Sequence, residues 1–293
     1  MEPKDESVHD YPRPLTAQWK ENWYFNFIDR ERGAWGINHV SLMRHKQEAR
    51  FSAFHVVDGE ALMYSNVVPI DDGFSELTDG KLKFDFLEPF RRFRLGFSGP
   101  RHEVELEYEA RFPIFDYALA RRPGKSGPLA LEHYEQALTV KGKITTAGKT
   151  RELRCLGHRD HSWGYRNESK VTGWNWVAIQ FPDKTVNLYR AVIGPAFIGS
   201  GFVSRAAGNL RIVRLTVEDT RFEQGAPVAS VYAGVDEKGG SWRFESSRFS
   251  TLYLPLSEKA QGVVIHENFA EFTDLATGEK GVGIDEYLIN PKV

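Results

Sequence analysis

The sequence is almost without cysteine and has no long apolar segment. Cys155 is the only cysteine among 293 residues, which excludes an intramolecular disulfide and a cysteine-based zinc cluster. No stretch approaches the roughly 20 apolar residues that cross a bilayer as a helix, so we expect no transmembrane segment. The opening MEPKDESVHDYPRPL lacks the charged and then apolar pattern of an export signal. Together these absences predict a cytoplasmic protein.

An excess of charge of either sign is also missing. The chain carries 38 basic and 40 acidic side chains, a formal charge of -2 at pH 7, and neither sign forms a long run. A phosphate backbone is usually met by clustered basic residues, so we expect no nucleic acid partner. The sequence has no GxSxG elbow, P-loop or strand-linked GxGxxG. It therefore lacks the signatures of elbow-type acyl transfer, nucleotide hydrolysis and nicotinamide binding.

What is present is a hydrophobic period of two. In HEVELEYEARF at 102–112, Val104, Leu106 and Tyr108 alternate with glutamates, as is typical of a half-buried strand. The same period predicts strands over 21–29, 50–58, 81–89, 93–98, 133–145, 185–193, 209–219, 241–249, 262–274 and 282–289. Turn pairs such as Asp58-Gly59 separate them. We expect an all-β chain with less than about 15% helix.

Sheet edges must be protected in such a chain, and closure into barrels does this most completely. We therefore predict two closed or half-closed antiparallel barrels. The segment 146–157 separates the first family of strands from a tryptophan-rich second half. We assign a flexible lead to 1–18, an N-terminal barrel-like domain to 19–150 and a C-terminal barrel to 151–293. The loop ARRPGKSGPL at 120–129 is interpreted as a surface connection rather than a mobile flap.

The stretch GHRDHSWGYR at 157–166 is unusually rich in groups that exchange protons. In an extended strand, one face carries His158, Asp160 and Ser162, and the other carries Arg159, His161 and Trp163. A carboxyl group that is partly desolvated inside a barrel can stay protonated and act as a general acid, whereas a cationic neighbour favours the ionised form. The alternative is structural: Asp160 pairs with Arg159 or Arg166 and caps a turn.

Aromatic residues follow this stretch. In GWNWVAIQFPD at 173–183, Trp174 and Trp176 are two residues apart and share one face of a strand. Such rings can line an apolar cavity, stack on a flat ligand or shield a carbocation. We expect Trp163 and at least one of Trp174 and Trp176 to line the largest apolar pocket. The alternative for each of these rings is ordinary core filling.

A metal site is the weaker interpretation of the histidines. His158 and Asp160, with His133 or His39, have the composition of a histidine–carboxylate triad. Pairs of the form HxD are common, so we expect no metal. His39, His55 and His266 lie in apolar or mixed strands and are more typical of core or surface histidines.

Three short motifs carry a family resemblance. They are RDHSWG at 159–164, WxW at 174–176 and HxEQ at 133–136. With them the chain resembles the AttH/carotenoid 1,2-hydratase-like superfamily over most of its length, and within it an uncharacterised bacterial branch with the RDHSWG signature. The resemblance implies two lipocalin-like (calycin-type) β-barrel domains side by side and a pocket for long apolar substrates. It also implies the addition or removal of water at alkenes, or polyene cyclisation, without metal or organic cofactor.

The resemblance further implies that Asp160 is the acid that protonates an alkene or a leaving hydroxyl. We add His158 and His161 as catalytic residues because they are close in sequence. The expected substrate contacts are Trp163, Trp174, Trp176, Tyr24 and Arg159. The predicted function is a cofactor-independent lyase or isomerase acting on a terpenoid- or steroid-like small molecule. The alternative is a lipocalin-like carrier without catalysis, for which a buried acid between imidazoles would have little use.

Overall fold

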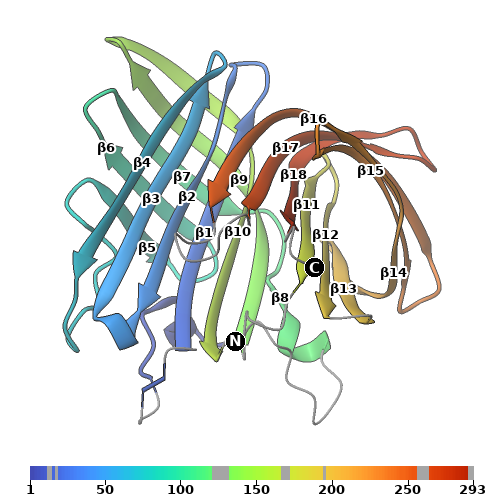
Figure 1. Ribbon diagram of the computed structural model, residues 1–293, viewed down its shortest axis with the longest axis horizontal. Coiled ribbons are helices and arrows are strands. Elements are labelled where there is room, and N and C mark those ends of the chain that lie inside the picture. The colour runs from blue at the N-terminus through green and yellow to red at the C-terminus, as the bar shows by residue number, and fades with distance from the viewer. Residues whose placement is uncertain are drawn as a thin grey trace. The chain divides into compact units, whose positions relative to one another are not determined.

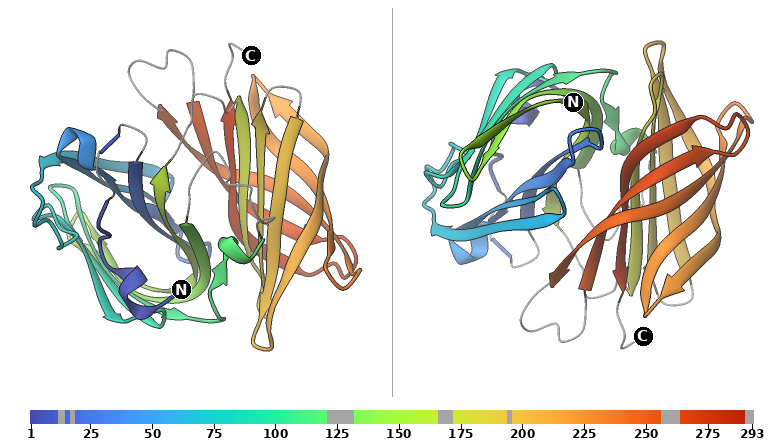
Figure 2. Two further views of the ribbon diagram at one scale, coloured as in Figure 1. Left: turned by 90° about the horizontal axis from the view of Figure 1, so that it is seen from below. Right: turned by 90° about the horizontal axis from the view of Figure 1, so that it is seen from above.

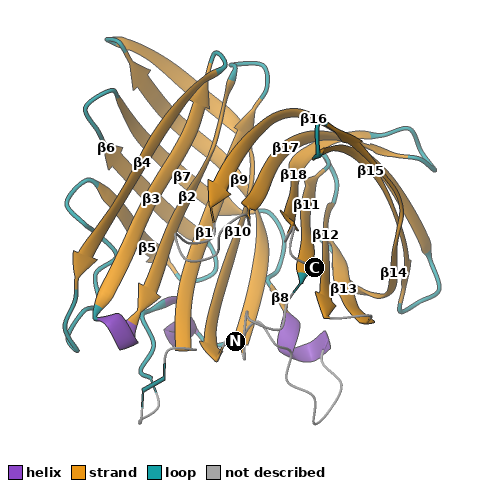
Figure 3. Ribbon diagram, in the orientation of Figure 1, coloured by secondary structure: helices purple, strands orange, loops and turns teal. Residues whose placement is uncertain are grey.

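The computed structural model describes residues 1–11, 15–16, 19–120, 132–165, 172–193, 196–255 and 264–289. Within these ranges the chain is almost entirely antiparallel strand, with three short 3-10 helices (Figure 3). The predicted all-β class is therefore confirmed. None of these helices has the length or apolar character needed to cross a membrane. Most of the loop predicted at 120–129 lies outside the described residues.

The first compact unit, Met1–Asn167, is a curled ten-stranded sheet (Figure 1). Its strands are β1 (Trp19–Asp29), β2 (Ala34–Met43), β3 (Glu48–Val57), β4 (Glu60–Pro69), β5 (Leu82–Glu88), β6 (Arg92–Ser98), β7 (His102–Ala110), β8 (Phe115–Asp116), β9 (Glu132–Thr146) and β10 (Lys149–Tyr165). Its 3-10 helices are η1 (Pro3–Glu6), η2 (Arg44–Lys46) and η3 (Tyr117–Ala120). The order across the sheet is β4-β3-β2-β1-β10-β9-β7-β6-β5, and β8 pairs with β9.

The sheet curls so that its two ends approach each other (Figure 2). Tyr64 of β4 donates a 2.6 Å hydrogen bond to Asp79, which lies just before β5, and packs against Phe97 of β6. The concave side holds the core, which includes Val104, Leu106 and Tyr108 of β7. The predicted alternation of β7 is thus confirmed: its apolar side chains face the core and its glutamates face solvent.

The second unit, Glu168–Val293, is a closed eight-stranded barrel. Its strands are β11 (Gly173–Gln180), β12 (Thr185–Ile193), β13 (Ala196–Arg205), β14 (Gly208–Glu223), β15 (Ala226–Asp236), β16 (Ser241–Pro255), β17 (Val264–Asp274) and β18 (Lys280–Ile289). Each strand pairs with the next, and β11 pairs with β18 to close the circle. Closure leaves no sheet edge exposed within the barrel.

The barrel interior is apolar at one end and polar at the other. Val177 and Ile179 of β11 point inward and pack with Phe181, Phe244 and Phe272. Towards the other end, inward positions of β15, β16 and β18 carry the hydroxyl and carboxyl groups of Tyr232, Ser246, Asp285 and Tyr287.

Two boundaries differ from the prediction. Strand β10 continues unbroken past residue 150 and pairs with β1 and β9, so it belongs to the first unit, and the units divide at Asn167 and Glu168 instead. The N-terminal lead 1–18, predicted to be flexible, is also partly packed against the sheet. Its helix η1 buries Glu6 at 2% exposure, because that carboxylate has a buried cationic partner in β10.

Candidate active site

Strand β10 carries the proton-exchanging stretch at the middle of the curled sheet. In its pairing with β1, Arg159 lies opposite Phe25 and His161 lies opposite Trp23. Both aromatic residues belong to the core, so this face of β10 is the inner face. Since strand side chains alternate, His158, Asp160 and Ser162 occupy the outer face. The predicted division into two faces is confirmed.

Asp160 is half-buried on the outer face. Its directly opposed neighbours are Tyr24 on β1 and Glu135 on β9, both buried. The structural alternative with Arg159 does not occur, because that guanidinium points to the inner face and pairs with Glu6. Arg166 lies outside the described residues. We call the following residues the outer-face cluster: Tyr24, Asn26, His133, Glu135, His158 and Asp160.

Glu135 is the charged centre of the outer-face cluster. Nε2 of His158 lies 2.7 Å from one carboxylate oxygen, and Nε2 of His133 lies 3.2 Å from the other. Burial raises the pKa of Glu135, but hydrogen bonds and charge from the two histidines outweigh it and hold that pKa below its ordinary value. His133 is in turn stacked on Tyr117, with ring centroids 4.7 Å apart. Glu135 is therefore a fixed carboxylate.

Polar groups on β1 complete the outer-face cluster. The side-chain amide of Asn26 donates to the hydroxyl of Tyr24 at 3.3 Å, and its carbonyl oxygen accepts the backbone N–H of His158 at 2.9 Å. Asn26 thereby ties β1 to β10 beside the carboxyl groups. The cluster offers a hydroxyl, an amide, two imidazoles and two carboxyl groups on three adjacent strands.

Arg159 lies on the inner face, away from Asp160. Its guanidinium makes a two-pronged pair with Glu6 at 2.7 and 2.8 Å and donates to Gln136 at 3.1 Å. It also lies over the ring of Phe93, 4.1 Å from its centroid. These contacts occupy a fully buried side chain. The structure thus gives Arg159 a docking role for η1, where we expected a substrate contact.

His161 and Trp163 also lie on the inner face. Nε2 of His161 lies 2.9 Å from Oε1 of Glu21, and its Nδ1 lies 3.1 Å from the hydroxyl of Tyr134. Trp163 stacks on His9 with ring centroids 3.9 Å apart. His161 was named as a catalytic residue because it is close to Asp160 in sequence, but the two side chains lie on opposite faces of β10.

Trp174 and Trp176 share one face of β11, as predicted, and it is the outer wall of the barrel. The neighbouring positions Val177 and Ile179 fill the barrel core, so the two indoles point away from it. Trp176 is buried, whereas Trp174 is partly exposed and donates its indole N–H to Glu286. Neither ring lines the barrel interior.

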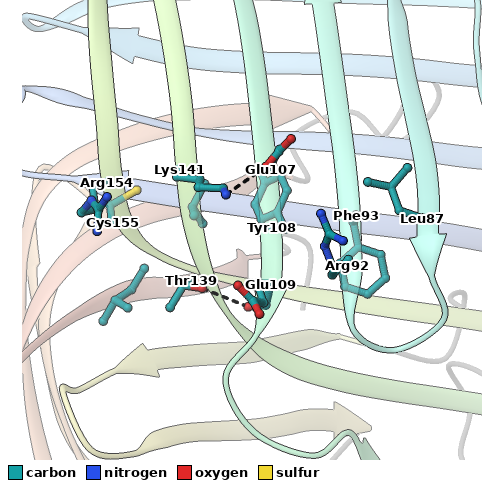
Figure 4. Close-up of a pocket in the computed structure, with 12 residues that line it drawn as sticks. Leu87, Arg92, Phe93, Glu107, Tyr108, Glu109, Thr139, Lys141, Arg154 and Cys155 are labelled. Atoms are coloured by element: carbon teal, nitrogen blue, oxygen red, sulfur yellow. Dashed lines mark hydrogen bonds and ion pairs between the residues drawn. The ribbon is translucent and has the colours of Figure 1, made fainter.

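A pocket of about 460 Å³ lies on the first unit (Figure 4). Its wall includes Leu87 and a 3.2 Å ion pair between Lys141 and Glu107. None of the three tryptophans expected at a cavity lines it. Burial raises the pKa of the lining thiol, Cys155, to about 12, so this thiol is protonated at neutral pH. We therefore do not assign chemistry to this pocket.

The polar end of the barrel holds a second acidic group, Asp285 of β18. It accepts hydrogen bonds from the hydroxyls of Ser246, at 2.6 Å, and Tyr232. Tyr232 in turn lies 2.7 Å from the hydroxyl of Tyr287. Burial raises the pKa of Asp285 to about 6, and the hydrogen bonds offset this only in part. Unlike Glu135, Asp285 has hydroxyl partners and no cation among them.

The comparison that decides the family is the match to one family model over nearly the whole chain. The model described as Domain of unknown function (DUF7064) matches residues 2–291. The chain belongs to this family. No curated protein matches it at a significant level.

Solved structures place the DUF7064 fold among known proteins. A putative AttH from Nitrosomonas europaea has a TM-score of 0.73 and 14% identity, over 98% of this chain and 95% of its own. Kievitone hydratase from Nectria haematococca has a TM-score of 0.67 and 12% identity, over 92% and 88%. CghA has a TM-score of 0.68 and 14% identity, over 94% and 88%. These neighbours confirm the resemblance to the AttH/carotenoid 1,2-hydratase-like superfamily at the level of the fold.

Several polar residues of this DUF7064 protein were missed by sequence reasoning. Glu6, His9 and Glu21 lie far from β10 in the chain, and no local pattern connects them to it. Asp285 and Tyr287 did carry a signal, because they are two residues apart in VGIDEYLI at 282–289, a predicted strand, and so share one face of it. Their inward direction could not be known before closure of the barrel was known.

Proposed function

We propose that the outer-face cluster is the active site of a hydro-lyase or isomerase, with Asp160 as the proton donor. The substrate class is an apolar, terpenoid- or steroid-like small molecule with an alkene or a tertiary or allylic alcohol. The fold shared with a kievitone hydratase supports a reaction that adds or removes water, although one fold serves many chemistries. The proposal therefore depends on the residues of the site and their geometry.

The observation that carries the proposal is the row formed by Tyr24, Asp160 and Glu135 across β1, β10 and β9. Glu135 is held as a carboxylate by two histidines. Asp160 lies directly opposite this carboxylate on the neighbouring strand, so the two carboxyl groups interact closely. Asp160 is also the more exposed of the two carboxyl groups, as a donor to substrate must be.

The proposed hydration adds one water molecule to the alkene and restores the proton of Asp160 at the end of the cycle. The carboxyl proton of Asp160 goes to one alkene carbon, which leaves a cationic carbon beside it. Water forms a bond to that cation and loses a proton, which returns to the Asp160 carboxylate directly or through His158. Dehydration runs through the same steps in reverse. In an isomerisation, the cation instead loses a proton from a neighbouring carbon to the Asp160 carboxylate, and no water is added. General acid catalysis of this kind contributes about 10²- to 10⁴-fold.

A second candidate acid and a second function class compete with this proposal. Asp285 has the raised pKa expected of a proton donor, and it lies inside a closed barrel. A carrier of lipocalin type would hold its ligand in that barrel without bond changes. The two carboxyl groups lie in different units, so single substitutions separate them.

The first experiment identifies what the protein binds and whether it reacts. The full chain is incubated with an apolar cell extract, and retained compounds are identified by native mass spectrometry. Each compound is then incubated with the protein in deuterated water. Hydration or isomerisation of an alkene should give a single carbon-bound deuterium in the product, at the carbon that Asp160 protonates, whereas dehydration of an alcohol should give an alkene that has lost water. Retention of an unchanged compound, without deuterium, would favour the carrier.

A further inference from the structure

Two histidines and a glutamate meet on the inner face of the curled sheet, apart from the outer-face cluster. They are His9 of the N-terminal segment, Glu21 of β1 and His161 of β10. Oε1 of Glu21 lies 2.7 Å from Nδ1 of His9 and 2.9 Å from Nε2 of His161. A ligand atom from each of the three residues lies within 4.8 Å of the other two. We call these residues the inner triad.

Stacked rings hold the inner triad in place. His9 stacks on Trp163 with ring centroids 3.9 Å apart, and His161 stacks on Trp23 at 4.5 Å. Glu21 and His161 are fully buried, while the side chain of His9 is 18% exposed. Stacking thus keeps the donor atoms close together and limits their movement to small rotations, and the His9 side gives access from solvent.

The second ring nitrogen of His161 also has a partner of the kind that metal-bound histidines use. Nδ1 of His161 faces the hydroxyl of Tyr134 at 3.1 Å, whereas Nε2 of His9 lies 3.7 Å from Asp5, beyond hydrogen-bond distance. In metal sites the free ring nitrogen usually donates to an oxygen, which fixes the tautomer and leaves the other nitrogen for the metal.

The proton on Tyr134 decides the tautomer of His161. The Tyr134 hydroxyl donates to Glu6 at 2.9 Å, and it has only one proton to give. Its oxygen can then only accept from Nδ1 of His161. Nε2 of His161, the other ring nitrogen, faces Oε1 of Glu21 at 2.9 Å. It is therefore placed to bind a metal ion that the same carboxylate holds.

We propose that His9, Glu21 and His161 bind a divalent first-row transition metal, for which Zn²⁺ is the probe. Two imidazoles and one carboxylate form a common protein set for such ions and leave a fourth position open. In a tetrahedral shell with metal–ligand distances of about 2.0–2.1 Å, ligand atoms are about 3.3 Å apart. The observed separations from Glu21 are slightly shorter, and small side-chain rotations open them.

The outer-face cluster provides the contrast. His133 and His158 also flank a glutamate, but they contact opposite oxygens of Glu135. Among the described residues, only the inner triad brings three such ligand atoms within one coordination sphere. His133 therefore supplies a matched control with the same residue type and a similar glutamate partner.

The test measures Zn²⁺ binding by the full chain after chelator treatment and dialysis, using isothermal titration calorimetry. We expect one Zn²⁺ per chain, and Co²⁺ should give the visible absorption bands of a tetrahedral site. His9→Ala and Glu21→Gln should abolish saturable binding. Tyr134→Phe should weaken it by about 10- to 100-fold, the usual effect of removing an outer-shell partner. His133→Ala should leave it unchanged.

The opposite pattern would overturn the site. Absence of stoichiometric binding by the wild-type chain would do so, as would equal binding by the His9→Ala and wild-type chains. Loss of binding in His133→Ala with retention in His9→Ala would move the metal to the outer-face cluster. Because Glu21 is fully buried, its variant is accepted only with a wild-type circular dichroism spectrum. His9→Ala, at a partly exposed residue, decides the question if Glu21→Gln does not fold.

Discussion

At the scale of single residues, buried carboxyl groups of this molecule differ because their partners differ. Burial raises the pKa of Glu6, but Arg159 and hydrogen-bond donors outweigh it and hold that pKa below its ordinary value. For Asp285 burial prevails, and its pKa rises to about 6. A guanidinium stabilises the charge of Glu6, whereas hydroxyl groups stabilise that of Asp285 only in part.

Asp285 predicts a specific pH dependence of stability. Its pKa rises from 3.8 to about 6 on folding, so the folded state binds the proton more tightly. The stabilising contribution is full below about pH 4 and is lost as the pH rises to about 6. A difference of about two pKa units corresponds to about 3 kcal/mol. Asp285→Asn should therefore gain about that much stability relative to wild type between pH 4 and pH 7.5.

Urea unfolding at the two pH values measures this gain. The quantity of interest is the difference between variant and wild type, since other groups titrate equally in both proteins. A difference that stays the same at pH 4 and pH 7.5 would show that Asp285 ionises as readily in the folded protein as in the unfolded chain. Asp79, an aspartate whose pKa is lowered on folding, is a control expected to change in the opposite direction.

At the scale of elements, the helix η1 is held by one buried ion pair. Arg159 and Glu6 are both almost fully buried, and a buried charge that loses its partner costs about 3–5 kcal/mol. Arg159→Met should therefore lower the free energy of unfolding by about that amount. The double variant Glu6→Leu with Arg159→Met should be less destabilised than Arg159→Met alone, because it leaves no charge behind. Urea unfolding at pH 7 compares them, and simple additivity of the two changes would contradict this account.

Individual strands also show which structural features could be predicted from the sequence. The alternation in 157–164 identified both faces of β10 correctly. It could not tell which face was inside, because that depends on Trp23 and Phe25 of β1, a strand more than a hundred residues away. The same limit applies to Trp174 and Trp176, whose shared face was predicted and whose outward direction was not. A period of two gives the faces of a strand, and only tertiary pairing decides which one is buried.

At the scale of the whole molecule, the two units differ in how their sheets end. The barrel closes through β11 and β18, while the first unit is an open sheet with edges at β4 and β5. The sequence predicted two barrel-like domains correctly. The boundary at 150 was misplaced because GKTRELRCLG has the composition of a connection, although its pairing with β9 makes it a strand.

This assignment of β10 predicts how the chain can be divided. Residues 168–293 should fold alone, because the barrel has its own core and no free edge. Residues 1–167 should also fold, whereas 1–150, cut at the predicted boundary, should not, since β1 and β9 lose the strand between them. Far-ultraviolet circular dichroism and a cooperative thermal transition distinguish these results. Cooperative folding of 1–150 would contradict the placement of β10.

The central claim is that Asp160 donates the proton, and the turnover of Asp160→Asn per folded molecule tests it most directly. Once a substrate is identified, this variant is compared with Asp285→Asn, the same substitution at the competing acid. We expect Asp160→Asn to keep the wild-type melting curve and ligand binding but to lose about 10²- to 10⁴-fold in turnover, while Asp285→Asn keeps full turnover. Full turnover by folded Asp160→Asn would contradict the claim.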